Sequence, residues 1–226
     1  MTFKGLIVVL AVAVLFSSCK KSGDLAPVNL TTNLNVVNAD ANSLNVYQNG
    51  NRLYNTSSLS PGSQSGYMAV SAGTQTYEFK IAGNYNYLFN GYQLKLDTGK
   101  SYTLFAAGET ADKLFVTTDL APVFSGTNAT YKAQLRYVNA SPGTTNLTVT
   151  VRDSLTFSNS AFKYASGFAY TGIGTSTIKI YQAGSTTPVF TGVATLAAGT
   201  YYTLVTKGTL TGTGGNQLSA VLFINQ

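Results

Sequence analysis

The segment LNVVNA at residues 34–39 returns as LRYVNA at residues 135–140, and this repeat indicates how the chain is organised. The match GKSYTL at residues 99–104 with GTYYTL at residues 199–204 keeps nearly the same offset, close to 100 residues. Solenoid and propeller repeats have periods of roughly 20 to 50 residues. The longer period therefore predicts two copies of a whole domain, divided by the segment 121–130.

Each copy consists of short runs with a period of two, bounded by Gly, Pro, Asn and Ser. Such runs predict an all-β fold of short strands, and the 10% content of charged residues agrees with it. The alternation places one set of side chains inward, as in a sheet with one packed face. The predicted strands cover residues 32–38, 43–48, 64–70, 75–81, 91–96, 101–107 and 113–119 in the first copy, and 132–139, 146–151, 165–171, 176–182, 188–195, 201–207 and 217–225 in the second.

Three motifs carry a resemblance to a known family. RYVNASP at residues 136–142 is similar to its opening strand, LNVYQNG at residues 44–50 to its second strand, and the pattern apolar-x-x-Gly-x-x-Tyr-Thr-apolar closes both copies. The chain thus resembles the bacterial family known as domain of unknown function 4397. The resemblance implies two tandem Ig-like or transthyretin-like antiparallel β-sandwich domains, at residues 32–121 and 131–226. It implies no chemistry.

The opening of the first copy departs from that family pattern. It has Asn35 and Asp40 where the second copy has Arg136 and Ser141, and the family usually has His where Asn139 stands. If a family function resides in that loop, the first copy is the one that lacks it.

The N-terminus has the layout of a lipoprotein signal peptide. Lys4 precedes an apolar run at residues 5–16, which is shorter than the roughly 20 residues of a membrane-spanning helix. LFSSC at residues 15–19 resembles the bacterial lipobox, which implies cleavage after residue 18 and acylation of Cys19. The alternative is a free thiol beside an ordinary cleavage site. Residues 19–31, polar and without a period, are expected to form a tether.

Acylation would anchor the protein in a membrane, because several acyl chains on one residue bind stably where a single chain is marginal. Lys20, with Asp at neither of the first two positions after the cysteine, resembles outer-membrane sorting in Gram-negative lipoproteins, and the chain resembles a Bacteroidetes-type lipoprotein. The expected location is therefore the outer membrane, on either its periplasmic or its cell-surface face.

The formal charge of +6 raises the question of a nucleic-acid partner. Phosphate binding needs clustered basic residues, whereas Lys80, Lys95, Lys163 and Lys179 stand singly along the chain. They are expected to lie on solvated strand faces, and no nucleic-acid partner is predicted.

Catalytic groups are scarce. The chain has no His and eight scattered acidic residues, and it has no Gly-x-Ser-x-Gly motif. No catalytic, cofactor-binding or metal-binding residues are predicted. The segment 40–43 superficially resembles a calcium loop, but it lacks the later Gly and Glu, so a hydrogen-bonded turn is the favoured interpretation.

One aromatic concentration, NYNYLFNGY at residues 84–92, is the candidate contact site. Tyr85, Tyr87 and Tyr92 would offer apolar rings with polar tips to a protein or glycan partner. The alternative is that Tyr87, Phe89 and Tyr92 lie in the core or on an edge strand.

These observations predict a non-enzymatic cell-envelope lipoprotein that binds or adheres to a protein or glycan partner. The alternative is a structural spacer or an assembly subunit of an envelope complex. The oligomeric state is not readable from the sequence.

Overall fold

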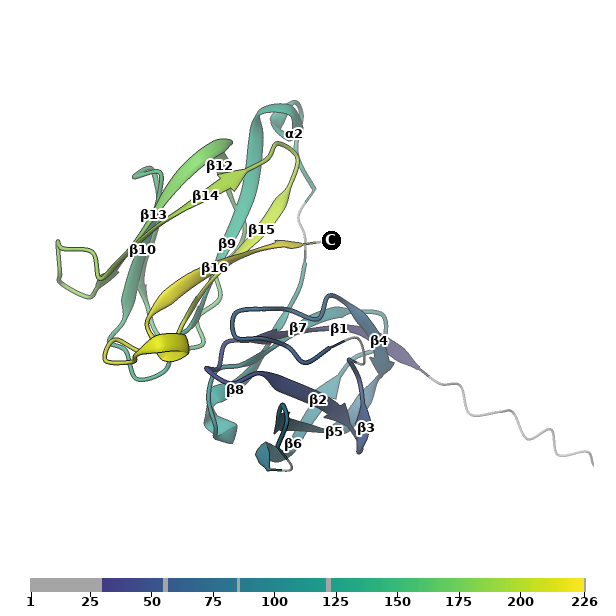
Figure 1. The fold of residues 1–226 in the computed structure, drawn as a ribbon. Helices are drawn as coiled ribbons and strands as arrows, with labels where there is room; N and C mark the ends of the chain where they lie inside the picture. The colour runs from purple at the N-terminus through teal and green to yellow at the C-terminus, as the bar shows by residue number, and fades with distance from the viewer. Residues whose placement is uncertain (1–29, 55–56, 85, 121–122, 226) are drawn as a thin grey trace, which may run out of the picture.

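The computed structural model describes residues 30–54, 57–84, 86–120 and 123–225. Within them the chain forms four four-stranded sheets, two in each of two domains (Figure 1). No helix in these residues is long and apolar enough to span a membrane. The all-β class and the two domains predicted from the sequence are confirmed.

The first domain contains strands β1 to β8, which form sheets in the orders β4-β1-β7-β8 and β3-β2-β5-β6. The strands are β1 Thr31–Asn38, β2 Leu44–Gln48, β3 Asn51–Arg52, β4 Met68–Ser71, β5 Gly73–Ile81, β6 Tyr87–Leu96, β7 Ser101–Ala106 and β8 Leu114–Thr118.

The second domain contains strands β9 to β16, in the orders β12-β9-β15-β16 and β11-β10-β13-β14. The strands are β9 Lys132–Ala140, β10 Leu147–Val151, β11 Leu155–Ser160, β12 Ala169–Gly172, β13 Gly174–Gln182, β14 Phe190–Leu196, β15 Tyr201–Lys207 and β16 Ser219–Asn225, and the short helix α2 Asn128–Tyr131 precedes them. Each strand has a counterpart eight positions earlier in the strand order, so the duplication extends to the topology.

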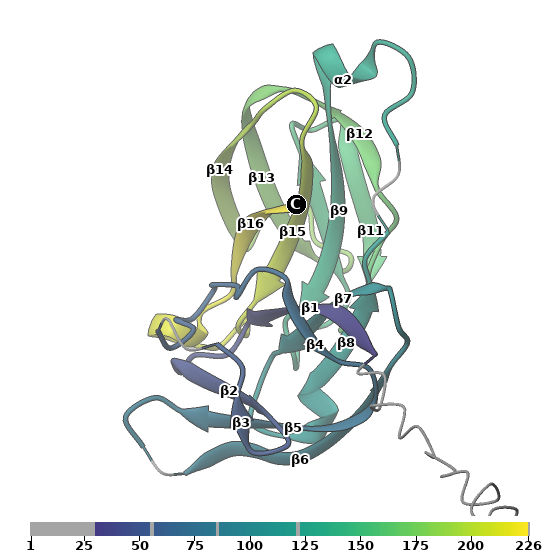
Figure 2. The same cartoon turned by 90° about the vertical axis from the view of Figure 1, so that its right-hand side faces the viewer.

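The sheets are mainly antiparallel, but each domain contains one parallel pair. β1 runs parallel to β7, with Val36 opposite Leu104, and β9 runs parallel to β15, with Tyr137 opposite Leu204. The first strand of each copy therefore lies beside the strand that carries the closing Tyr-Thr motif. These two strands form the centre of one sheet in each domain (Figure 2).

Each sandwich encloses its own apolar core, formed by the alternating side chains that face the opposite sheet. Leu34, Phe79 and Leu104 belong to the first core, and Leu135 and Ile180 to the second. All five are fully buried. These cores lie within residues 34–222, and the first strand begins at Thr31, the last residue of the predicted tether.

The repeated asparagine closes the same turn in both domains. Asn38 Nδ2 donates to the Leu59 carbonyl at 2.7 Å, and Asn139 Nδ2 donates to the Ser160 carbonyl at 2.9 Å. The Oδ1 atom of each accepts the backbone N–H two residues later, at 3.0 Å. Both side chains are fully buried with their amides satisfied, which explains why the sequence repeats them.

The closing motif also has one structural role in both copies. Gly99 and Gly199 adopt positive φ angles of 70° and 66°, which favour glycine in the turn before the strand. The hydroxyl of Tyr102 then accepts the backbone N–H of Asp97 at 3.2 Å, and that of Tyr202 accepts the N–H of Ala197 at 2.9 Å. The spacing of Gly and Tyr therefore encodes a turn and its cap.

Tyr77 should make the stability of the protein depend on pH in the alkaline range. It is fully buried, its hydroxyl accepts a hydrogen bond from Gln48 Nε2 at 2.9 Å, and burial raises its pKa to about 12. An unfolded tyrosine ionises near pH 10, so the unfolded chain loses this proton first. The contribution of Tyr77 to the free energy of unfolding should therefore be fully present below pH 10 and decrease as the pH rises toward 12.

Tyr77→Phe should flatten that decrease, at a cost at neutral pH of about 1 kcal/mol for the lost hydrogen bond. Urea unfolding at pH 8 and at pH 11 measures both effects. Tyr131→Phe, at a tyrosine that is 66% exposed, is the control and should leave both values unchanged. Equal pH slopes in Tyr77→Phe and the parent chain would contradict the assignment.

Candidate functional site

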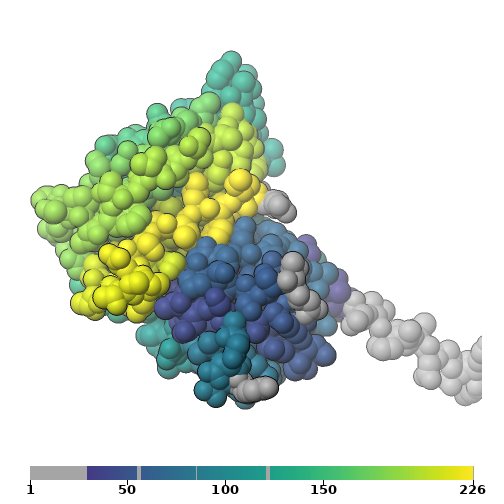
Figure 3. Space-filling model, viewed as in Figure 1, coloured from purple at the N-terminus to yellow at the C-terminus, as the bar shows by residue number. Residues whose placement is uncertain are grey.

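The two domains pack against each other through the outer faces of the sheets that contain β1 and β9 (Figure 3). A third apolar cluster fills this contact, with Phe105 and Phe115 stacked at 4.8 Å between ring centroids and Phe162 of the second domain edge-on to Phe115 at 5.8 Å. The other members are Val37, Ala39, Ala107, Val138, Ala140, Val205, Val221 and Phe223.

A buried ion pair crosses the same contact. Arg136 in β9 donates from Nη2 to Oδ1 of Asp119 at 2.6 Å, and both side chains are 6% exposed. Asp119 is the residue directly after β8. Arg136 Nε donates to Thr203 at 2.8 Å, while Tyr67 donates to Asp119 Oδ2 at 2.7 Å. Both charges are therefore hydrogen-bonded to neutral groups as well as to each other.

The environment of Asp119 also governs Tyr67. Burial and the adjacent Asp119 carboxylate raise the pKa of Tyr67 far above its ordinary value. The hydroxyl consequently keeps its proton and remains a donor to Asp119. The same carboxylate oxygen, Asp119 Oδ2, also accepts a hydrogen bond from the Thr103 hydroxyl.

Equivalent positions of the two domains supply this network. β1 and β9 provide Asn35 and Arg136, and β7 and β15 provide Thr103 and Thr203. Asp119 follows the residue that pairs with Tyr102, and Asn225 follows the residue that pairs with Tyr202. Thr203 donates to Asn225 at 2.9 Å, as Thr103 does to Asp119. The contact therefore has approximate two-fold symmetry, with the negative charge on one copy and the positive charge on the other.

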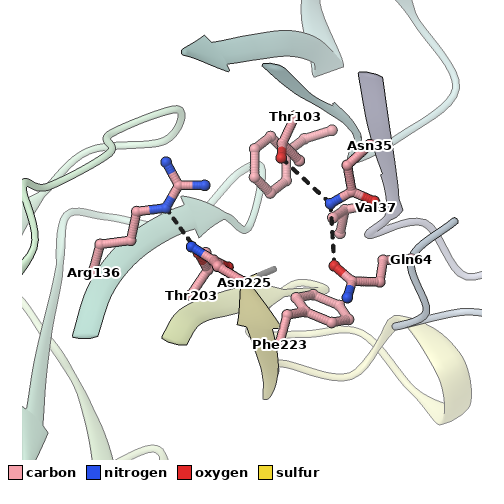
Figure 4. Close-up of a pocket in the computed structure, with 9 residues that line it drawn as sticks. Asn35, Val37, Gln64, Thr103, Arg136, Thr203, Phe223 and Asn225 are labelled. Atoms are coloured by element: carbon pink, nitrogen blue, oxygen red, sulfur yellow. Dashed lines mark hydrogen bonds between the residues drawn. The ribbon is translucent and has the colours of Figure 1, made fainter. Parts of the chain in front are cut away.

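Amide side chains fill the centre of the contact around a very small cavity (Figure 4). Asn35 Nδ2 donates to Gln64 Oε1 at 3.1 Å and to Thr103 at 3.3 Å. The cavity volume of about 10 Å³ has room for a single water molecule, and none for an organic ligand. This polar centre joins the domains and is unsuited to substrate binding.

A larger open groove of about 270 Å³ lies between loops of the two domains. Asp40, Glu109 and Lys113 line it from the first domain, and Pro142 and Asn216 from the second. Asp40 Oδ1 accepts the backbone N–H of Asn42 at 2.8 Å, so the calcium-like segment 40–43 forms a hydrogen-bonded turn, as the sequence favoured. Among the described residues, no group of three His, Cys, Asp or Glu side chains could hold a metal ion.

The three candidate tyrosines have different environments. Tyr85 lies outside the described residues, as does Cys19. Tyr92 is half-buried against the first core, edge-on to Phe89 at 6.0 Å between centroids, and burial raises its pKa. Tyr87 is 44% exposed at the start of the edge strand β6. Both residues therefore follow the alternative, Tyr92 against the core and Tyr87 on an edge strand, and the Tyr87 side chain remains exposed for contact.

Tyr87 belongs to a surface cluster that the sequence analysis did not identify. Lys80 Nζ in β5 lies 4.6 Å from the centroid of the Tyr87 ring and 4.8 Å from that of Tyr47 in β2. Strand pairing places Lys80 opposite Tyr87 on the outer face of the sheet. In the second domain, Val149 pairs with Ile180 as Val46 pairs with Phe79 in the first. The counterparts of Tyr47 and Lys80 are therefore Thr150 and Tyr181. The second domain thus lacks the cluster.

Comparison with known proteins identifies a family but no activity. The model of the family described as a domain of unknown function, DUF4397, matches residues 32–130 and again residues 133–226. No curated protein matches the chain.

Removal of one charge of the buried pair should destabilise the protein strongly. Arg136→Ala leaves Asp119 buried without its partner, which typically costs about 3 to 5 kcal/mol. Denaturant unfolding measures the loss. Lys179→Ala, which breaks the solvent-exposed pair with Asp153, is the matched control and should leave the midpoint unchanged. Equal midpoints for Arg136→Ala and Lys179→Ala would show that the interdomain pair has no structural weight.

Proposed function

Since the chain belongs to the DUF4397 family over both of its halves, we propose that it is a non-enzymatic lipoprotein of the bacterial cell envelope that binds a protein or glycan partner. The family carries no stated activity, so the proposal rests on this chain's own residues. Its two domains act as one rigid binding module, held on the outer membrane by the lipid on Cys19.

The observation that carries the binding proposal is the cluster of Tyr47, Lys80 and Tyr87. Two aromatic rings on either side of an ammonium group form a preorganised surface with apolar faces, hydroxyl tips and one positive charge. Rigid tyrosines lose little side-chain entropy on binding, which is why they dominate many recognition surfaces. The cluster lies on the outer sheet of the first domain, away from the contact between domains.

The interdomain contact supports the second candidate function, a structural spacer. An apolar cluster and a buried ion pair restrict the relative motion of the domains, as a spacer requires. Small-angle scattering distinguishes the two functions when combined with binding data. A rigid two-domain particle without any ligand favours the spacer, whereas a ligand that depends on Tyr87 favours the binding module.

Acylation of Cys19 can be tested directly. Mass spectrometry of the membrane-extracted protein should find an acylated cysteine at the mature N-terminus. Cys19→Ser should move the protein from the membrane fraction to the soluble fraction, because the acyl chains supply the membrane affinity. A Cys19→Ser protein that remains in the membrane would refute the anchor.

The surface cluster can be tested with a soluble chain that starts at Lys20, which retains all residues of the three apolar clusters. Glycan arrays and pull-downs with defined envelope proteins identify the partner class. Tyr87→Ala should weaken binding by about tenfold, equivalent to about 1.4 kcal/mol. Tyr131→Ala removes a more exposed tyrosine from α2 and is the matched control. Unchanged affinity in Tyr87→Ala would eliminate the cluster as the contact.

A further inference from the structure

Two long edge strands occupy equivalent positions in the two domains. β6 ends the sheet β3-β2-β5-β6, and β14 ends the sheet β11-β10-β13-β14. An edge strand presents unpaired backbone N–H and C=O groups that can pair with another chain. The two edges differ in how well these groups are protected.

The free groups of β14 follow from the register of its neighbour. Arg152 donates its backbone N–H to the Thr177 carbonyl at 2.9 Å. The backbone N–H and C=O of Thr177 therefore point toward β10. Val193 lies opposite Thr177 and consequently directs its own backbone groups away from β13. Thr191 and Thr195 share this orientation. In the described part of the chain, no backbone hydrogen bond joins any of the three to a segment on the open side.

The first domain protects its corresponding edge. Gly91 and Lys95 stand where β14 has Thr191 and Thr195, because Leu96 and Leu196 occupy the same register position. Gly91 has a φ of 81°, and the pairing of β5 with β6 shifts register between Tyr77 and Phe79. Irregular pairing and an edge lysine are the usual means by which proteins prevent strand association. β14 has neither between Phe190 and Leu196, where its register with β13 is continuous.

The sequence around β14 is suited to pairing with itself. Residues 183–206 contain no charged side chain, so two copies of the segment bring no like charges together. An antiparallel two-fold axis at Val193 places Val193 opposite its copy and Thr191 opposite the partner's Thr195. Thr–Thr is a favourable cross-strand pair, and a Val–Val pair removes apolar area from water. Val193 is 69% exposed and Val189 41%, so apolar area is available for burial.

From this edge we infer that two copies of the protein associate through β14, which joins their β11-β10-β13-β14 sheets into one antiparallel eight-stranded sheet. The partner is a second copy of this chain, and the contact is isologous. A contact of one strand pair buries less than the roughly 1,200 Å² of standard interfaces, so the dimer is weak and dissociates reversibly. The surface is separate from Tyr47, Lys80 and Tyr87, and the inference stands without the proposed partner binding.

Sedimentation equilibrium of the chain that starts at Lys20 tests the association over a range of concentrations. The parent chain should dimerise with a Kd of roughly 10 to 100 µM. Val193→Lys places two ammonium groups opposite each other and should weaken the dimer at least about tenfold. Gln93→Lys, at the equivalent exposed position of β6, is the matched control and should leave the Kd unchanged. Near-UV circular dichroism verifies that both variants are folded.

Cross-linking tests the register. Cys19 is the one cysteine of the chain, so the fragment from Lys20 has no thiol of its own. Opposite residues of antiparallel strands are about 4.5 to 5.5 Å apart at Cα, within reach of a disulfide. A mixture of Thr191→Cys and Thr195→Cys chains should form the mixed disulfide, while either variant alone should not cross-link. A parent chain that is monomeric at about 1 mM, or equal effects of Val193→Lys and Gln93→Lys, would overturn the proposal.

Discussion

The hydrogen-bonded pair of Arg136 and Asp119 is the constraint on which the relation between the two domains depends. Apolar contacts such as those of Phe105 and Phe115 are non-directional and would tolerate sliding of one sheet over the other. A charge that is 6% exposed tolerates no such movement, because displacement leaves it without its partner in a poorly solvated site. The apolar cluster therefore supplies attraction, while the ion pair selects one arrangement.

Much of the fold was predictable because the duplication supplies two independent readings of each element. Alternation and glycine turns predicted fourteen strands that have counterparts in the structure, although β4 and β12 begin four residues later than predicted. They missed β3, which has only two residues, and β11, where Ser158 and Asn159 obscure the period. The sequence also indicated one packed face per sheet, yet β9 is buried on both faces from Ala133 to Ala140. Alternation cannot identify a second packed face, because the extra buried residues read as ordinary variation.

The candidate sites show the same limit. Tyr87 and Tyr92 lie close together in the sequence, but the environment of each depends on β6, whose irregular pairing with β5 no local pattern reveals. Lys80 and Tyr47 were invisible as parts of a cluster, because strand register alone brings them to Tyr87. Arg136 did give a signal. An arginine between Leu135 and Tyr137, where the first copy has Asn35, indicates a buried partner on another element.

The symmetry of the interdomain contact explains where the two copies had to differ. In a two-fold contact between identical domains, each domain would have to carry both the arginine and the aspartate, because every contact occurs twice. A duplicated chain can instead place Asp119 in one copy and Arg136 in the other. Residues that serve each domain internally, such as Asn38 and Asn139, stayed the same. The outer sheets take no part in this contact, and there the copies diverged freely: one has an aromatic and lysine-bearing face, the other an uncharged edge. Covalent linkage of the domains thus allowed one surface to specialise in cohesion and left two different outer surfaces, which are the ones proposed above for partner binding and self-association.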